Sequence, residues 1–134
     1  MDQLRAQLEP TAGIIYLAGP YTHPDPAIRA ARAHDATIAA ARMIEQGYIV
    51  YSPLSMTHPI DVQMSADGET QGSDYWVAFD EAFMEHCAAI VVVMTSGWNQ
   101  SRGVAREIAF FEQRERRVVY ANPGWFGLES GFES

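Results

Sequence analysis

Four short runs of apolar, mostly β-branched residues alternate with longer segments of helical character, and this alternation constrains the fold most. The runs are GIIYLAG at 13–19, YIVYSP at 48–53, AAIVVVM at 88–94 and RRVVYA at 116–121. Runs of this length and composition are typical of buried strands. Strands separated by helices pair in parallel. The sequence therefore predicts a single-domain, three-layer α/β/α sandwich of the flavodoxin or Rossmann-like type, with four to five parallel strands.

Three helices are predicted between these strands, at residues 24–47, 74–87 and 103–115. The first has Asp25 as its N-cap, Pro26 in its first turn and Gly47 at its end, as helix boundaries commonly do. Residues 54–74 are polar, and a connection of that length is usually functional or mobile, so we expect a long loop.

The expected organisation is one domain over residues 1–134, with a core at about 14–121 and a tail from Asn122. The tail carries Pro123, Gly124, Trp125 and Phe126. Such aromatic residues favour packing on the domain or on a partner.

Composition and charge narrow the class of protein. The 134 residues are 48% hydrophobic and 19% charged, which is typical of a soluble globular domain. A net charge of −8 disfavours a nucleic-acid polymer as partner, whereas a helix N-terminus and local arginines still suit a small phosphorylated ligand. We expect no membrane segment, and the single Cys87 leaves no intrachain disulfide, so a cytoplasmic location is expected.

Candidate binding residues lie where the predicted strands end, because parallel sheets bind ligands at the carboxyl ends of their strands. Gly19, Pro20 and Tyr21 follow the first strand, and His58 follows the second. The four histidines have no spacing typical of a metal site, and we expect neither a metal nor another cofactor.

The segment SRGVAREIAFF at 101–111 places a carboxylate in an unusual position. At about 100° per residue, Val104, Ile108 and Phe111 share one helix face, with Arg106 on the opposite side toward solvent. Glu107 falls on the flank of the apolar face. A carboxylate there suits a nucleophile at a sugar carbon, and the alternative is a partly exposed residue that complements the helix dipole.

The start of the same helix favours an anion. Ser101 is a good N-cap, and Gly103 allows a ligand to approach the first exposed N–H groups. The partial positive charge of a helix N-terminus would keep the nearby Glu107 ionised. Alternatively, Ser101 is a plain N-cap that takes no part in binding a ligand.

The helix at 74–87 contains a second carboxylate on its apolar side. Trp76, Phe83 and Cys87 form one stripe with Asp80 in its middle, while Glu81 and Glu85 turn toward solvent. A buried, unpaired aspartate is costly and has a raised pKa. Asp80 and Glu107 suggest a pair with divided roles as proton donor and nucleophile; alternatively, Asp80 is bonded to loop amides.

Several segments together resemble the nucleoside 2-deoxyribosyltransferase superfamily, including the 2′-deoxynucleoside 5′-monophosphate N-glycosidases. The similar segments are IYLAGPY at the first strand, Asp80 before CAAIVVV, and GWNQSRGVAREIAFF. They fall between about Ile14 and Tyr120, and a GW..S.G...E signature resembles an uncharacterised bacterial branch.

The resemblance implies roles for individual residues. Glu107 would attack C1′ to form a covalent deoxyribosyl-enzyme, Asp80 would assist departure of the base, and Tyr16 would lie near the nucleophile. From the sequence alone, strand propensity favours ordinary aromatic packing as the explanation for Tyr16. Ser101 stands where transferases acting on free nucleosides carry an aspartate, which implies a 5′-phosphate, with Arg102 as an aid.

The expected activity is hydrolysis of the N-glycosidic bond of a (deoxy)nucleoside 5′-monophosphate. A deoxyribosyltransferase that exchanges bases, or a non-catalytic nucleotide-binding protein, are the alternatives. Trp98 would stack on a base or simply pack. The resemblance also implies a homo-oligomer, either a dimer or a tetramer.

Overall fold

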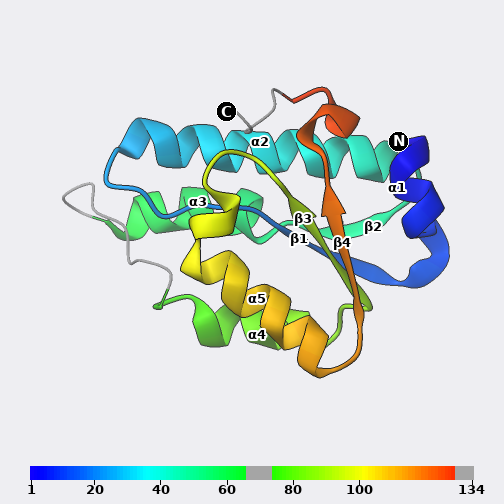
Figure 1. The fold of residues 1–134 in the computed structure, drawn as a ribbon. Helices are drawn as coiled ribbons and strands as arrows, with labels where there is room; N and C mark the ends of the chain where they lie inside the picture. Colours follow the sequence, from blue (N-terminus) through cyan, green and yellow to red (C-terminus); the bar gives the residue numbers. More distant parts are fainter. Residues whose placement is uncertain (66–73, 129–134) are drawn as a thin grey trace.

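The computed structural model describes residues 1–65 and 74–128 and contains a sheet of four parallel strands (Figure 1). The strands are β1 (Ile14–Ala18), β2 (Ile49–Tyr51), β3 (Ala89–Val93) and β4 (Arg117–Ala121). Their order across the sheet is β2-β1-β3-β4, and all three pairings are parallel. The predicted α/β class with a parallel sheet is confirmed, with four strands.

Helices cover both faces of this sheet (Figure 1). The helices are α1 (Asp2–Gln7), α2 (Pro26–Glu45), α3 (Pro53–Met64), α4 (Val77–Met84) and α5 (Arg102–Gln113). Helices α1 and α2 pack on one face together with the turn at Pro123–Phe126, and α4 and α5 pack on the other. Helix α3 lies against α2 and β1.

The alternation of side chains along the central strands builds the two core layers. In β1, Ile15 and Leu17 enter the layer under α2, while Tyr16 and Ala18 enter the layer under α4 and α5. Successive strand side chains point to opposite faces, and both faces of this sheet are covered by helices. This explains why the strands appear in the sequence as continuous apolar runs.

Two predicted boundaries are correct, and one segment is wrong. Asp25 accepts a hydrogen bond from the Ala27 amide at 2.9 Å as N-cap of α2, and Gly47 adopts φ +96° just beyond the helix. The loop expected at 54–74 instead begins with α3, which contains Pro59. Packing on α2 supports a helix that polar composition and an internal proline argue against. The part of the expected loop at residues 66–73 lies outside the described residues.

Both ends of the chain contribute to the core beyond the expected 14–121. Helix α1 was not predicted, yet Leu4 is fully buried in the layer under α2. In the tail, Phe126 is buried in the same layer, as expected for packing on the domain. Helix α4 is shorter than predicted, because the residues before Val77 form turns.

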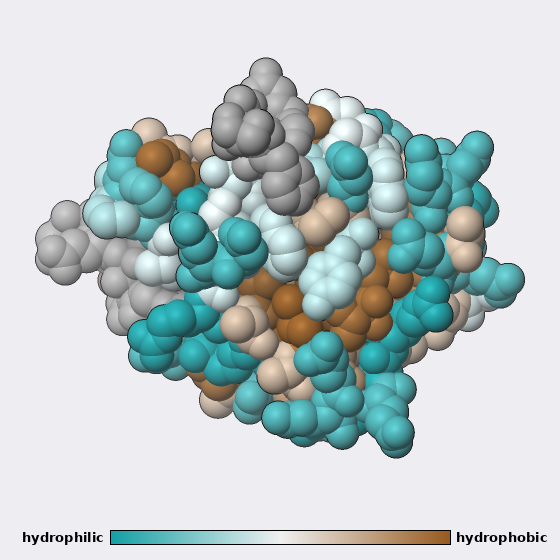
Figure 2. All heavy atoms as spheres, viewed as in Figure 1, coloured by the Kyte–Doolittle hydropathy of each residue, from teal (hydrophilic) through white to brown (hydrophobic). Residues whose placement is uncertain are grey.

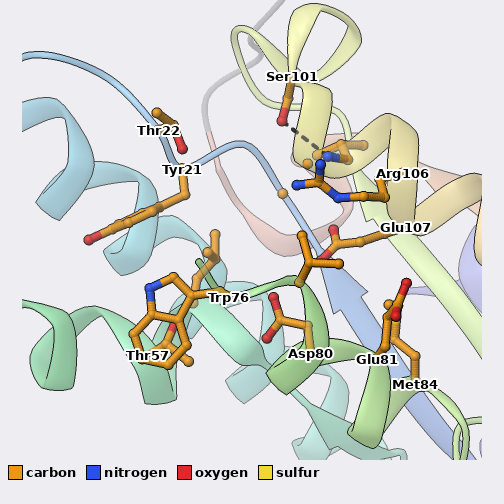
Figure 3. A pocket seen from close by; sticks show the side chains of 15 residues that line it. Tyr21, Thr22, Thr57, Trp76, Asp80, Glu81, Met84, Ser101, Arg106 and Glu107 are labelled. Carbon is orange, nitrogen blue, oxygen red and sulfur yellow. Dashed lines mark hydrogen bonds between the residues drawn. The ribbon is translucent and has the colours of Figure 1, made fainter. Parts of the chain in front are cut away.

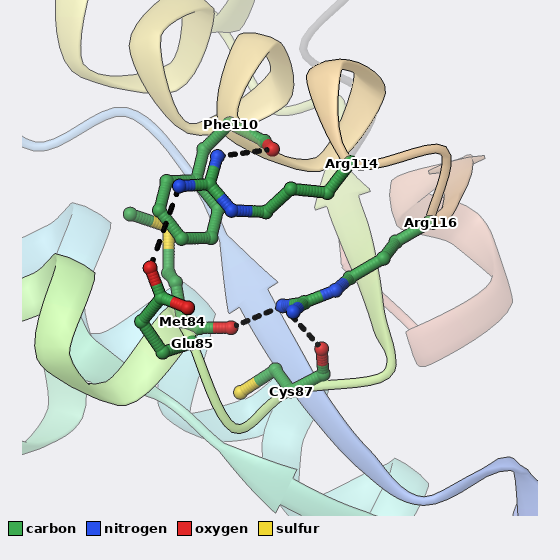
Figure 4. A network of polar contacts seen from close by, with 6 residues as sticks. All are labelled: Met84, Glu85, Cys87, Phe110, Arg114 and Arg116. Atoms are coloured by element: carbon green, nitrogen blue, oxygen red, sulfur yellow. Dashed lines mark hydrogen bonds and ion pairs between the residues drawn. The ribbon is translucent and has the colours of Figure 1, made fainter.

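Two arginines fix α4 relative to α5 and β4 (Figure 4). Arg116 donates to the carbonyl oxygens of Met84 and Cys87 at 2.9 and 3.1 Å, where α4 ends. Arg114 lies over the ring of Phe110 and pairs with Glu85 at 3.4 Å. These contacts hold the ends of the two helices together, which sets how Asp80 on α4 and Glu107 on α5 approach one another.

The face that carries β4, the edge strand of the sheet, gathers apolar side chains at its centre (Figure 2). Val118 and Ile108 are half-buried, and Tyr120 is 40% exposed. Within residues 1–65 and 74–128, no helix combines the length and the apolar character needed to cross a membrane.

Candidate active site

A pocket opens at the carboxyl ends of β1 and β3, the two adjacent strands from which the chain winds outward in opposite directions. This is the switch point at which open parallel sheets bind ligands. Its walls come from the segment after β1, from α3 and α4, and from the first turns of α5 (Figure 3). The empty volume is about 600 Å³, open solvent included.

Glu107 and Tyr16 form the floor of the site. The Ser101 cap fixes where α5 begins, so that Glu107, six residues after the cap, meets Tyr16 of β1. The Tyr16 hydroxyl, fully buried, donates to Glu107 Oε2 at 2.5 Å. The sequence alone favoured ordinary packing for Tyr16, and the structure adds a direct hydrogen bond to the predicted nucleophile.

The pKa of Glu107 is raised to about 8, chiefly by burial; the Tyr16 hydrogen bond and Arg106 oppose the rise, and the charge of Asp80 adds to it. At neutral pH the Glu107 carboxyl group is therefore mostly protonated. The expectation that the helix N-terminus keeps Glu107 ionised is wrong. The physical reason is that desolvation of the carboxylate outweighs the partial charge of the helix end.

Asp80 enters the same pocket from α4 (Figure 3). Burial raises the pKa of Asp80 to about 6, and Arg106 opposes that shift. Its Oδ1 atom is buried and has no hydrogen-bond partner among the described residues, so at this atom the interpretation as a carboxylate bonded to loop amides fails. Two carboxyl groups with raised and different pKa values thus line one hollow, an arrangement typical of acid–base sites.

Trp76, assigned by the sequence to an apolar stripe, also lines this pocket. Its Nε1 donor is buried without a partner among the described residues. A buried unpaired donor and the unpaired acceptor of Asp80 are costly in an empty site and favourable when a ligand pairs with them. Phe83, the next residue of that stripe, is instead 37% exposed and stacks on Tyr51 at 4.3 Å.

Two charged residues that the helical pattern placed toward solvent line the pocket instead. Arg106 has a side chain only 30% exposed and pairs with Asp74 at 3.2 Å, and Glu81 lies on the α4 side. The pattern assumed one buried face per helix. The first turns of α5 and α4 face each other across the pocket as well as facing the sheet, so side chains off the main apolar stripe also enter it (Figure 3).

The N-terminus of α5 forms the rim. Ser101 accepts a hydrogen bond from the Val104 amide at 3.1 Å, which confirms it as the N-cap, and Ser101 and Gly103 both line the pocket. Gly19 and Tyr21 line it from the segment after β1. These four predicted residues are therefore brought together with Glu107 and Asp80.

Other predicted binding residues lie elsewhere. His58 does not line the pocket but binds the Tyr21 hydroxyl through Nδ1 at 2.7 Å. Trp98 packs against Tyr120 with ring centroids 5.7 Å apart, and its Nε1 has no partner among the described residues. Pro20 is buried and does not line the pocket, and Arg102 lines an adjoining hollow.

A second polar cluster lies behind Tyr21, and the sequence predicted little of it. The Tyr21 hydroxyl also donates to Asp61 Oδ2 at 3.3 Å, and Asp61 on α3 is 1% exposed. Arg29, 7% exposed on α2, donates to the carbonyl oxygens of His23 and Pro24. Arg29 lies four residues before the buried Ala33, so a search for charges in phase with the alanines of α2 would have found it.

Among the described residues, no three ligating side chains lie close enough together to hold a metal ion. The groups that the site presents are two carboxyl groups, a tyrosine hydroxyl and a helix N-terminus.

No curated protein matches the sequence. A family model does match, over residues 13–122, from just before β1 to just after β4. The chain therefore belongs to the family described as a domain of unknown function (DUF1937).

Proposed function

We propose that the protein hydrolyses the N-glycosidic bond of a (deoxy)nucleoside 5′-monophosphate, with Glu107 as the nucleophile. The observation that carries the proposal is the convergence of Glu107 and Asp80 on one pocket, with the Tyr16 hydroxyl bonded to Glu107. Glycosidic cleavage with a covalent intermediate needs a nucleophile and a separate proton donor, and two carboxyl groups supply both.

The reactive form has Glu107 ionised and the proton on Asp80, which is the minor arrangement at neutral pH because the pKa of Glu107 is about 8 and that of Asp80 about 6. In the first step, a carboxylate oxygen of Glu107 attacks C1′, and the electrons of the C1′–N bond pass to the base, which takes a proton from Asp80. In the second step, Asp80 accepts a proton from water as the water oxygen attacks C1′. The bond from C1′ to Glu107 breaks, which releases the sugar 5-phosphate and restores both carboxyl groups. The Tyr16 hydroxyl stabilises the Glu107 anion before attack and after release.

The 5′-phosphate is assigned to the N-terminus of α5. Ser101 and Gly103 lie on the rim of the pocket that holds Glu107, so a sugar above the carboxylates directs its 5′-substituent toward them. Exposed N–H groups at a helix N-terminus favour a phosphate. A hydroxyl at Ser101 does not repel that phosphate as a carboxylate would.

The primary test is incubation of the protein with the four deoxynucleoside and four ribonucleoside 5′-monophosphates, with release of free base followed by chromatography. We expect release from at least one of them. Addition of a second base distinguishes exchange from hydrolysis, since a transferase would form a new nucleotide faster than it releases sugar phosphate. Ligand-dependent thermal shifts without base release would instead support a non-catalytic binding protein.

The covalent step has its own test. Mass spectrometry of protein quenched during turnover should find the mass of one sugar phosphate added to the peptide containing Glu107. Glu107→Gln should remove the adduct, whereas Glu112→Gln, on an exposed residue of the same helix, should keep it. An adduct that survives Glu107→Gln would contradict the mechanism.

Self-association into a dimer or tetramer is part of the proposal. It is supported by the edge strand β4, on which Tyr120 is 40% exposed, and by the apolar side chains at the centre of the face shown in Figure 2. Light scattering at working concentration measures it directly, and a monomer would contradict it.

A further inference from the structure

A second hollow adjoins the carboxylate pocket at the N-terminus of α5. The two hollows share Thr22, Ser101 and Gly103, so they are continuous across the rim. The second has an empty volume of about 800 Å³, open solvent included. A ligand whose sugar lies over Glu107 can therefore extend past Ser101 into this space.

Among the residues that the structure describes, the second hollow is lined by two arginines and no carboxylate. Arg32 comes from α2 and Arg102 from the first residue of α5, and the remaining lining residues are uncharged or histidine. This is a local exception in a chain with a net charge of −8. Arg102 has a side chain 81% exposed, and its pairing with Asp74 is weak at 3.9 Å, so it is free to turn toward an anion.

Among the described residues, Arg32 is held in place by backbone groups and has no acidic partner. Its Nη1 donates to the Thr22 carbonyl oxygen at 2.9 Å, and its Nη2 to that of Ser96 at 3.5 Å. A guanidinium has five N–H donors, so these two bonds leave donors for a ligand. Neither bond neutralises its charge.

Gly97 makes room for this guanidinium. The residue adopts φ +91°, and a Cβ atom there would lie 2.8 Å from Arg32 Nη2. A side chain at this position would displace the Arg32 head group from the hollow. The glycine thus fixes both the local turn and the access of Arg32 to the space beside Ser101.

We propose that this hollow binds a second phosphoryl group, so that the preferred ligand is a (deoxy)nucleoside 5′-diphosphate. The first phosphoryl group lies at the N-terminus of α5, and the second lies between Arg32 and Arg102. The inference rests on the proposed function for the position of the sugar and goes beyond it in the class of substrate.

The test compares 5′-mono- and 5′-diphosphates of the same nucleoside by titration calorimetry, together with inorganic phosphate and pyrophosphate. We expect the diphosphate to bind at least about tenfold more tightly than the monophosphate. Its second phosphoryl group would form charge-assisted hydrogen bonds with the arginines, and these are stronger than hydrogen bonds between neutral groups. Pyrophosphate should likewise bind more tightly than phosphate.

Arg32→Met and Arg102→Met should each weaken diphosphate binding by about tenfold and monophosphate binding by much less. Arg42→Met is the matched control, since Arg42 is on the same helix as Arg32 but pairs with Glu45 at 2.6 Å, away from the hollow. Arg102 is exposed enough that its substitution leaves folding intact, which covers the case in which Arg32→Met fails to fold.

Equal affinity of the unchanged protein for both nucleotides would overturn the inference. So would a loss of melting temperature in Arg32→Met with no change in the diphosphate preference of either variant, since that marks a purely structural arginine. A diphosphate preference without base release would refute the glycosidase and leave this inference standing. Base release from monophosphates without that preference would do the reverse.

Discussion

Two tyrosine–carboxylate pairs lie near the same end of the sheet, and they differ in how completely their polar groups are satisfied. Tyr16 donates to Glu107 beside Asp80, whose buried Oδ1 lacks a partner among the described residues. Tyr21 donates to Asp61 but is also bound by His58. Beside the first pair, Asp80 retains unmet hydrogen-bonding capacity inside the pocket, whereas the second pair belongs to a network that links Tyr21 to two side chains of α3.

The difference separates groups kept ready for a ligand from groups that hold the scaffold. Buried polar networks that are well satisfied stabilise a fold, while unpaired buried groups reduce stability unless a ligand pairs with them. We therefore expect substitutions in the Tyr16 pair to change activity and substitutions in the Tyr21 pair to change stability.

The largest effect should come from the carboxyl group of each pair, Glu107 in the first and Asp61 in the second. Glu107→Gln should reduce base release by at least about 10³-fold, because it removes the nucleophile. Asp61→Asn should instead leave turnover within a few-fold and destabilise the protein by about 1–3 kcal/mol, because Asp61 is buried in its network. Turnover assays and urea unfolding of both variants measure this. Full activity in Glu107→Gln, or unchanged stability in Asp61→Asn, would contradict the division of the two pairs into one for activity and one for stability.

The two tyrosines provide a matched pair at smaller scale. Tyr16→Phe removes the hydrogen bond that lowers the pKa of Glu107, so that pKa should rise above about 8 and kcat/KM at neutral pH should fall about tenfold. Tyr21→Phe keeps the aromatic ring in the pocket and should lower kcat/KM less than threefold. Steady-state kinetics on both variants are needed, and equal losses would argue against a special role for Tyr16.

Stability should depend on pH through Glu107. Its pKa is about 8 when folded against an ordinary value of 4.5, so between these values the folded state binds more protons than the unfolded state. Stability is then highest below about pH 4.5 for this group and declines as pH rises toward about 8. As pH rises from about 4.5 to about 8, the melting temperature of Glu107→Gln should therefore increase relative to that of the unchanged protein. Glu112→Gln should show no such trend.

The smallest effect concerns Arg106. The rate profile should be bell-shaped, with limbs set by the coupled pair at about pH 6 and about pH 8. Arg106 lowers the pKa of both carboxyl groups, so Arg106→Gln should move both limbs upward by up to about one pH unit. A profile that keeps its position would show that Arg106 acts only through its pairing with Asp74.

Local sequence signals predicted those parts of the molecule that depend on local physics. Apolar runs predicted the strands because both faces of the sheet are covered, and Asp25 and Ser101 were identified as helix caps because capping uses only neighbouring amides. Helix α3 was missed since its support comes from α2, which outweighs an unfavourable internal Pro59.

The sequence by itself determined the parallel α/β fold, the cap that begins α5 and the two carboxylates near the sheet, because periodicity and capping are short-range effects. Only the tertiary structure decided which side chains share a hollow. It turned Arg106 and Glu81 into the pocket, joined Tyr21 to Asp61 from a distant helix, and brought Arg32 beside Arg102. It also decided the protonation of Glu107, since desolvation depends on every element packed around a carboxyl group rather than on its own helix.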